Sequence, residues 1–381
     1  MRGRRNDQPQ MFFTIDVEAR IRRDHPLRAL KRAIDEILHE LGPRFEAAYS
    51  RTGRPSVPPE RLLKALLLMT LYSLRSERQL VERIDTDLLF RWFLDMSPED
   101  EVFDSTAFAH NRPRLDQHGL TAAFFDAVLA RAIQAGLCSD EHFTVDGTLI
   151  ESYASLKSFR PKDEPADKGD SNGFQPRNPD VDFHGQQRTN ETHASRTDPE
   201  ARLYRKGRGK ESKLAHMGHA IAENRHGLVV SVTVTDANGT AERDATLVML
   251  DQLRSHHSID PKTLGADKGY DSGPFFLALE NRGVEPHCAV IELAPPKPEN
   301  VAPCRRLAVD ARERMKARLG TLGYDLSQRC RKKIEEYFGW MKTIGRLERS
   351  RWVGRWKLKQ QMELTAAAYN LVRMRKLLAS G

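Results

Sequence analysis

The chain has 381 residues, 39% hydrophobic and 30% charged, which is typical of a folded protein of two or three domains and excludes small disulfide scaffolds, collagens and coiled coils. Its strongly apolar stretches are far shorter than the ~20 residues that cross a bilayer, so no membrane span is expected. The first residues also lack the apolar stretch of a secretory signal, and we expect a cytoplasmic protein with reduced cysteines.

The net charge of +8 is concentrated near the C-terminus. Residues 342–381 carry ten Lys or Arg side chains against two Glu, which accounts for the whole excess. Trp340, Trp352 and Trp356 accompany these cations, and indole rings can stack on bases while Lys and Arg neutralise phosphates. The segment therefore favours a nucleic-acid-binding surface, with a solvated basic helix as the alternative.

Helical patterns begin after a tail that we expect to span residues 1–25. From Pro26 to Leu41, apolar residues recur at helical spacing, and Gly42 follows where a C-terminal cap belongs. A second amphipathic helix is expected over residues 58–71, where two prolines mark the start.

A third helix is expected to begin at Ser76, because Ser76 and Gln79 form a capping-box pattern. The second and third helices, joined by a short turn, suggest a helix-turn-helix. Two further helices follow, one capped by Asp104 and one over residues 121–136.

Together these helices predict an all-α DNA-binding domain over residues 26–136. Its arginines, Arg78 among them, can contact DNA phosphates. The alternative is that they are merely solvated, as arginines on an exposed helix usually are.

Strand patterns begin at His142. Residues 143–149 form an apolar strand with Asp146 in its middle, where a carboxylate is costly unless something pairs with it. A polar stretch over residues 153–210 then predicts either a disordered insertion or a loosely folded arm.

Beyond this insertion, strands and helices alternate. We expect strands over 216–223 and 228–234, a helix over 247–253, a strand over 263–267, a helix over 275–279 and a strand over 287–291. This order predicts an α/β domain with a mixed sheet over residues 137–345, interrupted by the insertion and followed by a basic C-terminal helix over 346–381.

One late helix, residues 331–342, combines an apolar stripe with a charged row. Arg331, Glu335 and Lys342 follow one another at spacings of four and seven, so they lie on one face of that helix.

Three acids stand inside or at the ends of apolar elements: Asp146, Asp267 and Glu335. If the two strands are neighbours and the helix packs on them, these carboxylates converge, and such oxygen ligands suit Mg²⁺ or Mn²⁺. Two ions roughly 3.5 to 4 Å apart can support in-line phosphoryl transfer. Each acid also has an ordinary explanation: neighbouring threonines, a helix cap, or an ion pair with Arg331.

The segments that carry these acids, Thr144–Thr148, Gly265–Asp271 and Arg331–Lys342, together resemble the DDE transposases of bacterial insertion sequences, in the group with a Tyr-Arg-Glu-Lys signature. Residues 53–114 resemble the helical N-terminal region of the same group. The resemblance covers most of the chain, from about residue 12 to 375.

The resemblance implies a ribonuclease H-like catalytic fold in which Asp146, Asp267 and Glu335 bind two Mg²⁺ or Mn²⁺ ions. It also implies that Arg331 and Lys342 contact the phosphates of the transposon end. In the basic segment that follows, Arg346 and Arg351 are further candidates for DNA contact.

Two positions near the glutamate differ from the signature or duplicate it. Where the group has a tyrosine three residues before the arginine, this chain has Gln328, and the nearest upstream tyrosine is Tyr324. Glu336 follows Glu335, but only Glu335 keeps both the spacing of four and that of seven.

We therefore expect a DNA transposase that binds terminal inverted repeats, hydrolyses the phosphodiester at each end and joins the freed 3′ hydroxyls to target DNA. Its expected partners are double-stranded DNA and, by family analogy, a second copy of the chain. The alternatives are a metal-dependent nuclease without strand transfer and a catalytically inactive DNA-binding derivative.

Overall fold

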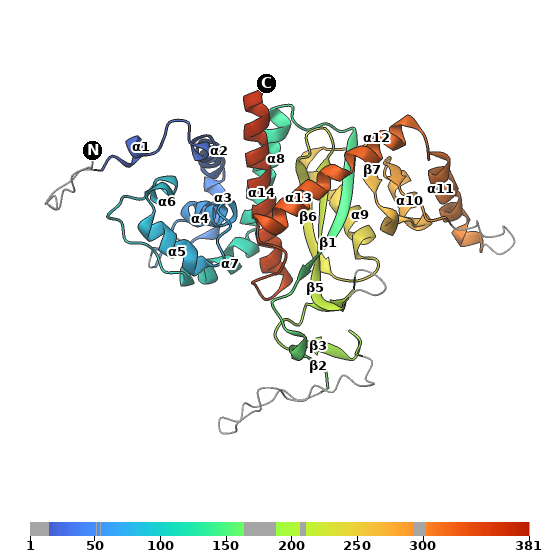
Figure 1. The fold of residues 1–381 in the computed structure, drawn as a ribbon, viewed down its shortest axis with the longest axis horizontal. Helices are drawn as coiled ribbons and strands as arrows, with labels where there is room; N and C mark the ends of the chain where they lie inside the picture. Colours follow the sequence, from blue (N-terminus) through green and yellow to red (C-terminus); the bar gives the residue numbers. More distant parts are fainter. Residues whose placement is uncertain are drawn as a thin grey trace, which may run out of the picture.

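The computed structural model describes residues 15–50, 52–53, 55–163, 188–205, 211–292 and 302–380. Helices make up the N-terminal part, and a mixed sheet covered by helices makes up the remainder (Figure 1). Helix α14, residues Arg355–Ser380, stands between the two parts. Residues 1–14 of the predicted tail over residues 1–25 lie outside the described residues, and the described part of it contains helix α1 (Val17–Arg20).

The N-terminal part contains the expected helices and three short ones that the sequence pattern did not indicate. The helices are α1 (Val17–Arg20), α2 (Pro26–Glu40), α3 (Gly42–Ala48), α4 (Pro59–Leu71), α5 (Glu77–Thr86), α6 (Leu88–Phe93), α7 (Thr106–Gln117) and α8 (Leu120–Gln134). These three, α1, α3 and α6, have only four, seven and six residues, too few turns for a clear helical period.

Two helix ends show how local chemistry sets these bounds. Ser76 caps α5 as expected, with its hydroxyl accepting from the Gln79 N–H. At the end of α2, however, the cap is Leu41 in a right-handed conformation, and Gly42 already begins α3 because Pro43 at its start is preset for a helix. The prediction that Gly42 caps the first helix is therefore wrong.

The sheet has six strands: β1 (His142–Glu151), β4 (Arg202–Tyr204), β5 (Lys213–Glu223), β6 (Val229–Asp236), β7 (Thr263–Ala266) and β8 (Glu285–Cys288). Strands β1, β5 and β6 pair antiparallel, whereas β7 and β8 run parallel to β1 on its other side. Across the sheet, the strands therefore lie in the order β6, β5, β1, β7, β8, and the short strand β4 also pairs with β5. This order confirms the predicted α/β domain with a mixed sheet and helices N-terminal to it.

The last strand differs from its expected position at residues 287–291. Strand β8 spans Glu285–Cys288 because it pairs in parallel with the four residues of β7, beginning at Thr263 opposite Glu285. A short edge strand ends where its partner ends.

Helices cover both faces of the sheet. On one face lie α9 (Ala241–His257) and α10 (Gly273–Glu280), which share a core with Phe143 and Val145 of β1. On the other lie α13 (Lys332–Thr343) and α14, which share a core with Ile150. Helices α11 (Arg306–Ala317) and α12 (Leu322–Cys330) lead into α13. The alternation along β1 therefore directs odd-numbered residues to the α9 face and even-numbered residues to the α13 face.

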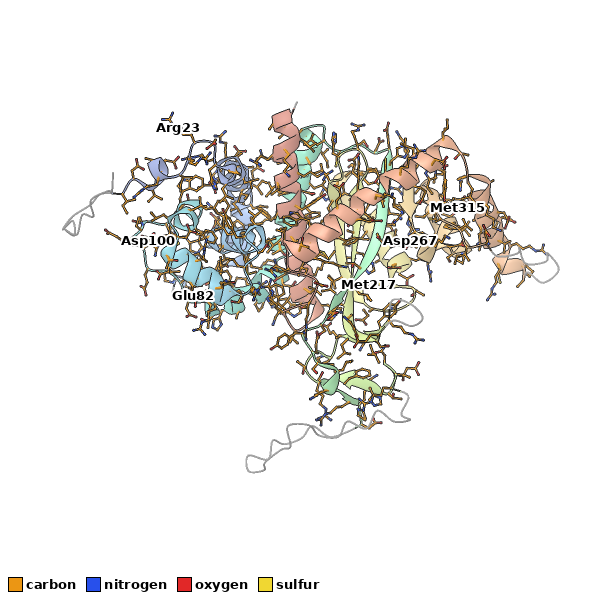
Figure 2. The ribbon with its side chains drawn as sticks, in the orientation of Figure 1. Arg23, Glu82, Asp100, Met217, Asp267 and Met315 are labelled. Carbon is orange, nitrogen blue, oxygen red and sulfur yellow. The ribbon has the colours of Figure 1, made fainter. Side chains whose placement is uncertain are left out.

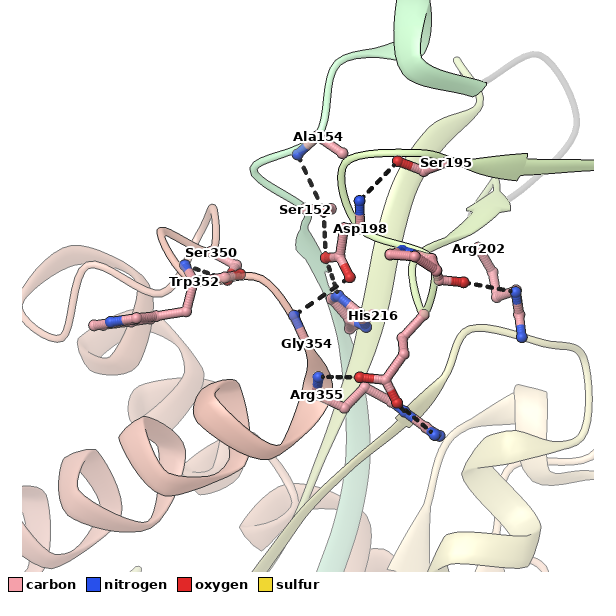
Figure 3. Close-up of polar contacts among 12 residues, drawn as sticks. Ser152, Ala154, Ser195, Asp198, Arg202, His216, Ser350, Trp352, Gly354 and Arg355 are labelled. Carbon is pink, nitrogen blue, oxygen red and sulfur yellow. Dashed lines mark hydrogen bonds and ion pairs between the residues drawn. The ribbon is translucent and has the colours of Figure 1, made fainter. Parts of the chain in front are cut away.

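The described parts of the polar insertion are folded against this core. Strands β2 (Phe159–Pro161) and β3 (His193–Ser195) pair with each other, while β4 pairs with β5. Figure 3 shows the polar anchor at their base: Asp198, fully buried, accepts from Ser152 at 2.8 Å and contacts His216 at 2.9 Å. Residues 164–187 and 206–210 of the insertion lie outside the described residues.

The same anchor reaches the start of α14. The Gly354 N–H donates to Asp198 at 3.3 Å, and the next residue, Arg355, pairs with Glu200 (Figure 3). The insertion is therefore joined both to the sheet and to the C-terminal helix.

Helix α14 is a central packing element. It begins at Arg355 rather than at residue 346, and its buried side chains pack against α8, α4 and β6. Trp340 and Trp352 also pack against this core, and Trp352 stacks with Arg112 and Arg351. The expectation that these two indole rings stack on bases is therefore not supported. Among the described residues, no helix has both the length and the apolar character that a membrane span requires.

Candidate active site

Asp146 and Asp267 come from adjacent parallel strands. The register pairs Thr144 of β1 with Gly265 of β7, and Asp146 and Asp267 each follow this pair by two residues, Asp267 directly after the end of β7. Neighbouring strands lie about 4.8 Å apart, so the two backbones are close at this point. Figure 2 labels Asp267 at the sheet, on the side of the molecule away from the N-terminal helices.

A backbone amide orients each aspartate. The Gly147 N–H donates to Oδ1 of Asp146 at 2.8 Å, and the Gly269 N–H donates to Oδ1 of Asp267 at 2.8 Å. The second bond makes Asp267 the cap of the short 3₁₀ turn Lys268–Tyr270. Each amide therefore fixes the position of one carboxylate oxygen.

Glu335 lies in the first turn of α13, on the face of the sheet to which Asp146 also points. Its side chain is 58% exposed and lies 3.8 Å from the Arg331 guanidinium. Helix α13 packs on β1 and β5, and in Figure 1 it crosses the sheet obliquely. The helix therefore brings Glu335 to the same face as the two aspartates.

Within the described ranges, no three His, Cys, Asp or Glu side chains approach closely enough to hold one metal ion. The fold thus brings the elements of the three predicted acids together, while their carboxylates do not converge on a single point. Like charges repel, so carboxylates gather around one point when a cation holds them there.

Gln328 occupies the signature tyrosine position and contacts the ends of β7 and β8. Its side-chain amide donates to the His287 carbonyl and, at 3.5 Å, to the Ala266 carbonyl, next to Asp267. Tyr324 packs its ring on His287 instead, and burial raises its pKa. Both residues of α12 thus support the strand ends beside the aspartates.

The predicted cationic residues fall into two regions. Arg331 precedes α13 and Lys342 lies in its last turn, both on the helix of Glu335. Arg78 lies apart, on α5 of the N-terminal part, with its side chain 86% exposed and 3.7 Å from Glu82.

Arg346 and Arg351 follow α13 in the segment before α14. Arg346 is exposed and has a positive φ. Arg351 donates to the Leu74 carbonyl at 2.9 Å, and burial, together with the nearby charge of Arg346, lowers its pKa. Arg351 thus connects this segment to the N-terminal helices, whereas Arg346 faces solvent.

One acid beside the aspartates was not identified from the sequence. Glu242, in the first turn of α9, lies against Gly147 and close to Gly269, each of which follows a predicted catalytic aspartate. Charged residues are common in the first turn of any helix, so Glu242 itself gave no signal. The signal was the glycine near each aspartate, which leaves room for a neighbouring side chain.

Comparisons with known proteins agree with the assembled fold. Residues 15–114 match the family model described as "Transposase domain (DUF772)", and residues 141–371 match the one described as "Transposase DDE domain". No curated protein matches the chain.

Solved structures of the Mos1 transposase are also similar to the chain. The pre-cleavage Mos1 transpososome shares 14% identity over 87% of this chain and 81% of that chain, and the Mos1 mariner paired end complex with Mn shares 13% over 87% and 90%. The TM-score is 0.20 for each, too low to argue geometry from them. The DDE model alone matches more than half of the chain, which therefore belongs to the DDE transposase family and is a DNA transposase, an enzyme that uses divalent metal ions.

Proposed function

We propose that this transposase binds the terminal inverted repeats of its own element, cleaves the phosphodiester at each end and joins the freed 3′ hydroxyls to target DNA. The supporting observation is the register between β1 and β7, which brings Asp146 beside Asp267 on the face covered by the helix of Glu335. The proposed metal ligands are these three carboxylates.

The donor chemistry fits Mg²⁺ or Mn²⁺. All three proposed ligands are carboxylates, and backbone amides already orient Asp146 and Asp267. Two bound ions would stabilise charge on the attacking and leaving oxygens of an in-line phosphoryl transfer. The identity and number of the ions are part of the proposal.

The chain itself would hold the DNA strand. Arg331 and Lys342 flank Glu335 on α13, so phosphates bound by them would lie along the same helix as the carboxylate. Arg346 and Arg351 would extend this basic surface towards the N-terminal helices. Arg78 would contact DNA from α5.

The proposed partners are double-stranded DNA, as element ends and as target, and a second copy of the chain. Two ends must be brought together before joining, and one enzyme copy on each end achieves this. We propose that the protein works at bacterial DNA in the cytoplasm, as an insertion-sequence transposase.

The test compares the wild type with Glu335→Gln on a labelled duplex that carries the element's ends, in Mg²⁺. Glu336→Gln is the matched control, because Glu336 is the adjacent exposed glutamate on the same helix and pairs with Arg373 at 3.0 Å. We expect cleavage and joining by the wild type and by the control, and DNA binding alone by Glu335→Gln.

Other outcomes point to the alternatives. Cleavage without joining by the wild type would indicate a nuclease, and binding without cleavage would indicate an inactive DNA-binding derivative. Loss of cleavage in Glu336→Gln rather than in Glu335→Gln would identify Glu336 as the third metal ligand in place of Glu335.

A further inference from the structure

The first turn of α9 is attached to the turn that follows Asp267. Arg243 donates from its guanidinium to the Gly269 carbonyl at 3.0 Å and to the Gly239 carbonyl at 3.1 Å. This arrangement fixes the neighbouring residue, Glu242, next to the end of β7.

Glu242 occupies space that two glycines leave open. A Cβ on Gly147 would lie 2.5 Å from Oε1 of Glu242. A Cβ on Gly269 would lie 3.6 Å from Oε2 of Glu242 and 3.0 Å from Oδ1 of Asp267. The carboxylates of Glu242 and Asp267 therefore border the same small space, beside the residue that follows Asp146.

The strand ends explain why Glu242 can reach this point from the α9 face. Strand β7 ends at Ala266, whereas β1 continues to Glu151, so β7 does not cover the second half of β1 on that side. The Glu242 carboxylate lies at this uncovered edge, where the two aspartates also stand.

A buried hydroxyl provides an independent indication of a ligand here. Tyr270 is fully buried, and its hydroxyl has no hydrogen-bond partner within the described part of the chain. The hydroxyl of the nearby Thr246 donates instead to the Glu242 carbonyl at 2.6 Å. Burial raises the Tyr270 pKa, and the charges of Glu242, Asp146 and Asp267 raise it further.

We propose that Glu242 is a fourth carboxylate of the active site and binds a divalent cation together with Asp146 and Asp267. The inference rests on the proposed function, because it adds a ligand to the proposed metal site. Its physical reason is donor chemistry: carboxylate oxygens suit Mn²⁺ and Mg²⁺, and the carboxylates of Glu242 and Asp267 border one small space. The unpartnered Tyr270 hydroxyl would then face a hydrated ion.

The test measures Mn²⁺ binding to the full-length protein without DNA, by calorimetry. Glu242→Gln keeps the size of the side chain and removes its charge, and we expect it to weaken Mn²⁺ binding by about tenfold to a hundredfold, as loss of a metal-supporting residue does. The matched control is Asp244→Asn, an exposed acid in the same turn of α9, which should bind Mn²⁺ like the wild type.

Asp146→Asn and Asp267→Asn separate this inference from the proposed metal site. If these two variants lose Mn²⁺ binding while Glu242→Gln binds like the wild type, the inference is wrong and the proposed metal site stands. If all three variants bind like the wild type, the proposed metal site is wrong as well.

A fold control separates metal binding from stability. The metal-free Glu242→Gln protein should melt within a few degrees of the wild type, and Glu242→Asp should recover part of the Mn²⁺ affinity. Two results together would exclude a ligand role. The first is that Glu242→Gln loses Mn²⁺ affinity and also melts far below the wild type. The second is that Glu242→Asp melts like the wild type but binds Mn²⁺ no more tightly than Glu242→Gln.

Discussion

The carboxylate of Glu242 occupies the space that a side chain on Gly147 would need. The atoms it would meet, Oε1 at 2.5 Å and Cγ at 2.9 Å, belong to a flexible side chain. Glu242 can therefore rotate away at small cost, whereas backbone in the same position could not.

Gly147→Ala should consequently displace Glu242 without unfolding the protein. We expect a stability loss below about 1 kcal/mol, since the side chain yields, together with a loss of Mn²⁺ affinity similar to that of Glu242→Gln. Denaturant unfolding and calorimetry measure the two effects. In a variant that combines Gly147→Ala with Glu242→Gln, the two losses of Mn²⁺ affinity should not add, because both substitutions remove the same carboxylate from the site. Additive losses would show that position 147 acts independently of Glu242.

Gly273→Ala should behave in the opposite way. A Cβ there would collide with the Ala308 carbonyl oxygen and lie 2.9 Å from its carbonyl carbon, so α10 and α11 would have to separate. We expect a loss of about 1–3 kcal/mol in the free energy of unfolding, the usual cost of overpacking. The control is Gly339→Ala on α13, where nothing lies within 4 Å and alanine favours the helix. Equal stability of the two variants would contradict this account.

His219 should make the protein less stable in mild acid. It is buried in β5, its Nε2 lies 2.7 Å from the Thr235 hydroxyl, and burial lowers its pKa from 6.5 to about 4. Below pH 6.5 the unfolded chain takes up a proton that the folded protein refuses, so the stability falls with pH until about pH 4.

Each pH unit in that range should cost about 1.4 kcal/mol from this histidine alone. The measurement is the free energy of unfolding of the wild type minus that of His219→Gln between pH 7 and pH 4. That difference should decline steadily over the range. A flat difference would show that His219 titrates normally in the folded protein.

The predictability of the site depended on how unusual each residue looks in its local pattern. Asp146 stands out because an acid interrupts an apolar strand, and Asp267 because it ends one. Glu242 does not stand out, since its place beside Gly147 comes from the packing of α9 on the sheet and not from local sequence. The same holds for the order of the strands: their existence follows from alternation, while the pairing of β1 with β5 on one side and β7 on the other is a tertiary property.

Helix α14 shows a second reason why sequence patterns can mislead. Its polar residues indicated a basic surface helix, yet several of them are buried with specific partners. Gln360 donates to the Arg112 carbonyl at 2.9 Å, and Asn370 bonds both backbone groups of Val229 at 2.7 and 2.9 Å. A buried polar side chain with a partner looks like a surface residue in sequence, because the partner lies far along the chain.

Asp198 should be a main contributor to the attachment of the insertion. Burial raises the pKa of the Asp198 carboxyl, but the hydrogen bonds with His216 and Ser152 lower this pKa by a larger amount. The carboxylate is therefore ionised and paired. Asp198→Ala leaves these buried groups unpaired and should cost about 3 kcal/mol. Ser152→Ala removes one hydrogen bond and should cost about 1 kcal/mol. Urea unfolding at pH 7 gives both values, and similar losses would contradict the anchoring role.

The same carboxylate predicts a pH window. Because the folded pKa of Asp198 lies below that of the unfolded chain, its contribution is complete above the unfolded pKa of about 3.9 and is lost as the pH falls further. The stability difference between the wild type and Asp198→Ala should therefore be constant from pH 5 to 7 and shrink below pH 4. A difference that stays constant below pH 4 would contradict a lowered pKa of Asp198.

Arg331 should bind DNA phosphate, and the salt dependence of binding should reveal it. Arg331 is half-buried, its Nε has no hydrogen-bond partner among the residues described, and its guanidinium lies near Glu335. If it binds a phosphate, Arg331→Gln removes one ionic contact and should reduce the slope of log affinity against log salt by about 0.9, with weaker binding to element ends.

Lys262→Gln is the control: Lys262 lies at the opposite end of β7 and contacts Asp140 at 3.5 Å. Binding titrations with an element-end duplex at several salt concentrations measure both slopes, and an equal slope in Arg331→Gln and the wild type would show that Arg331 serves only to position Glu335.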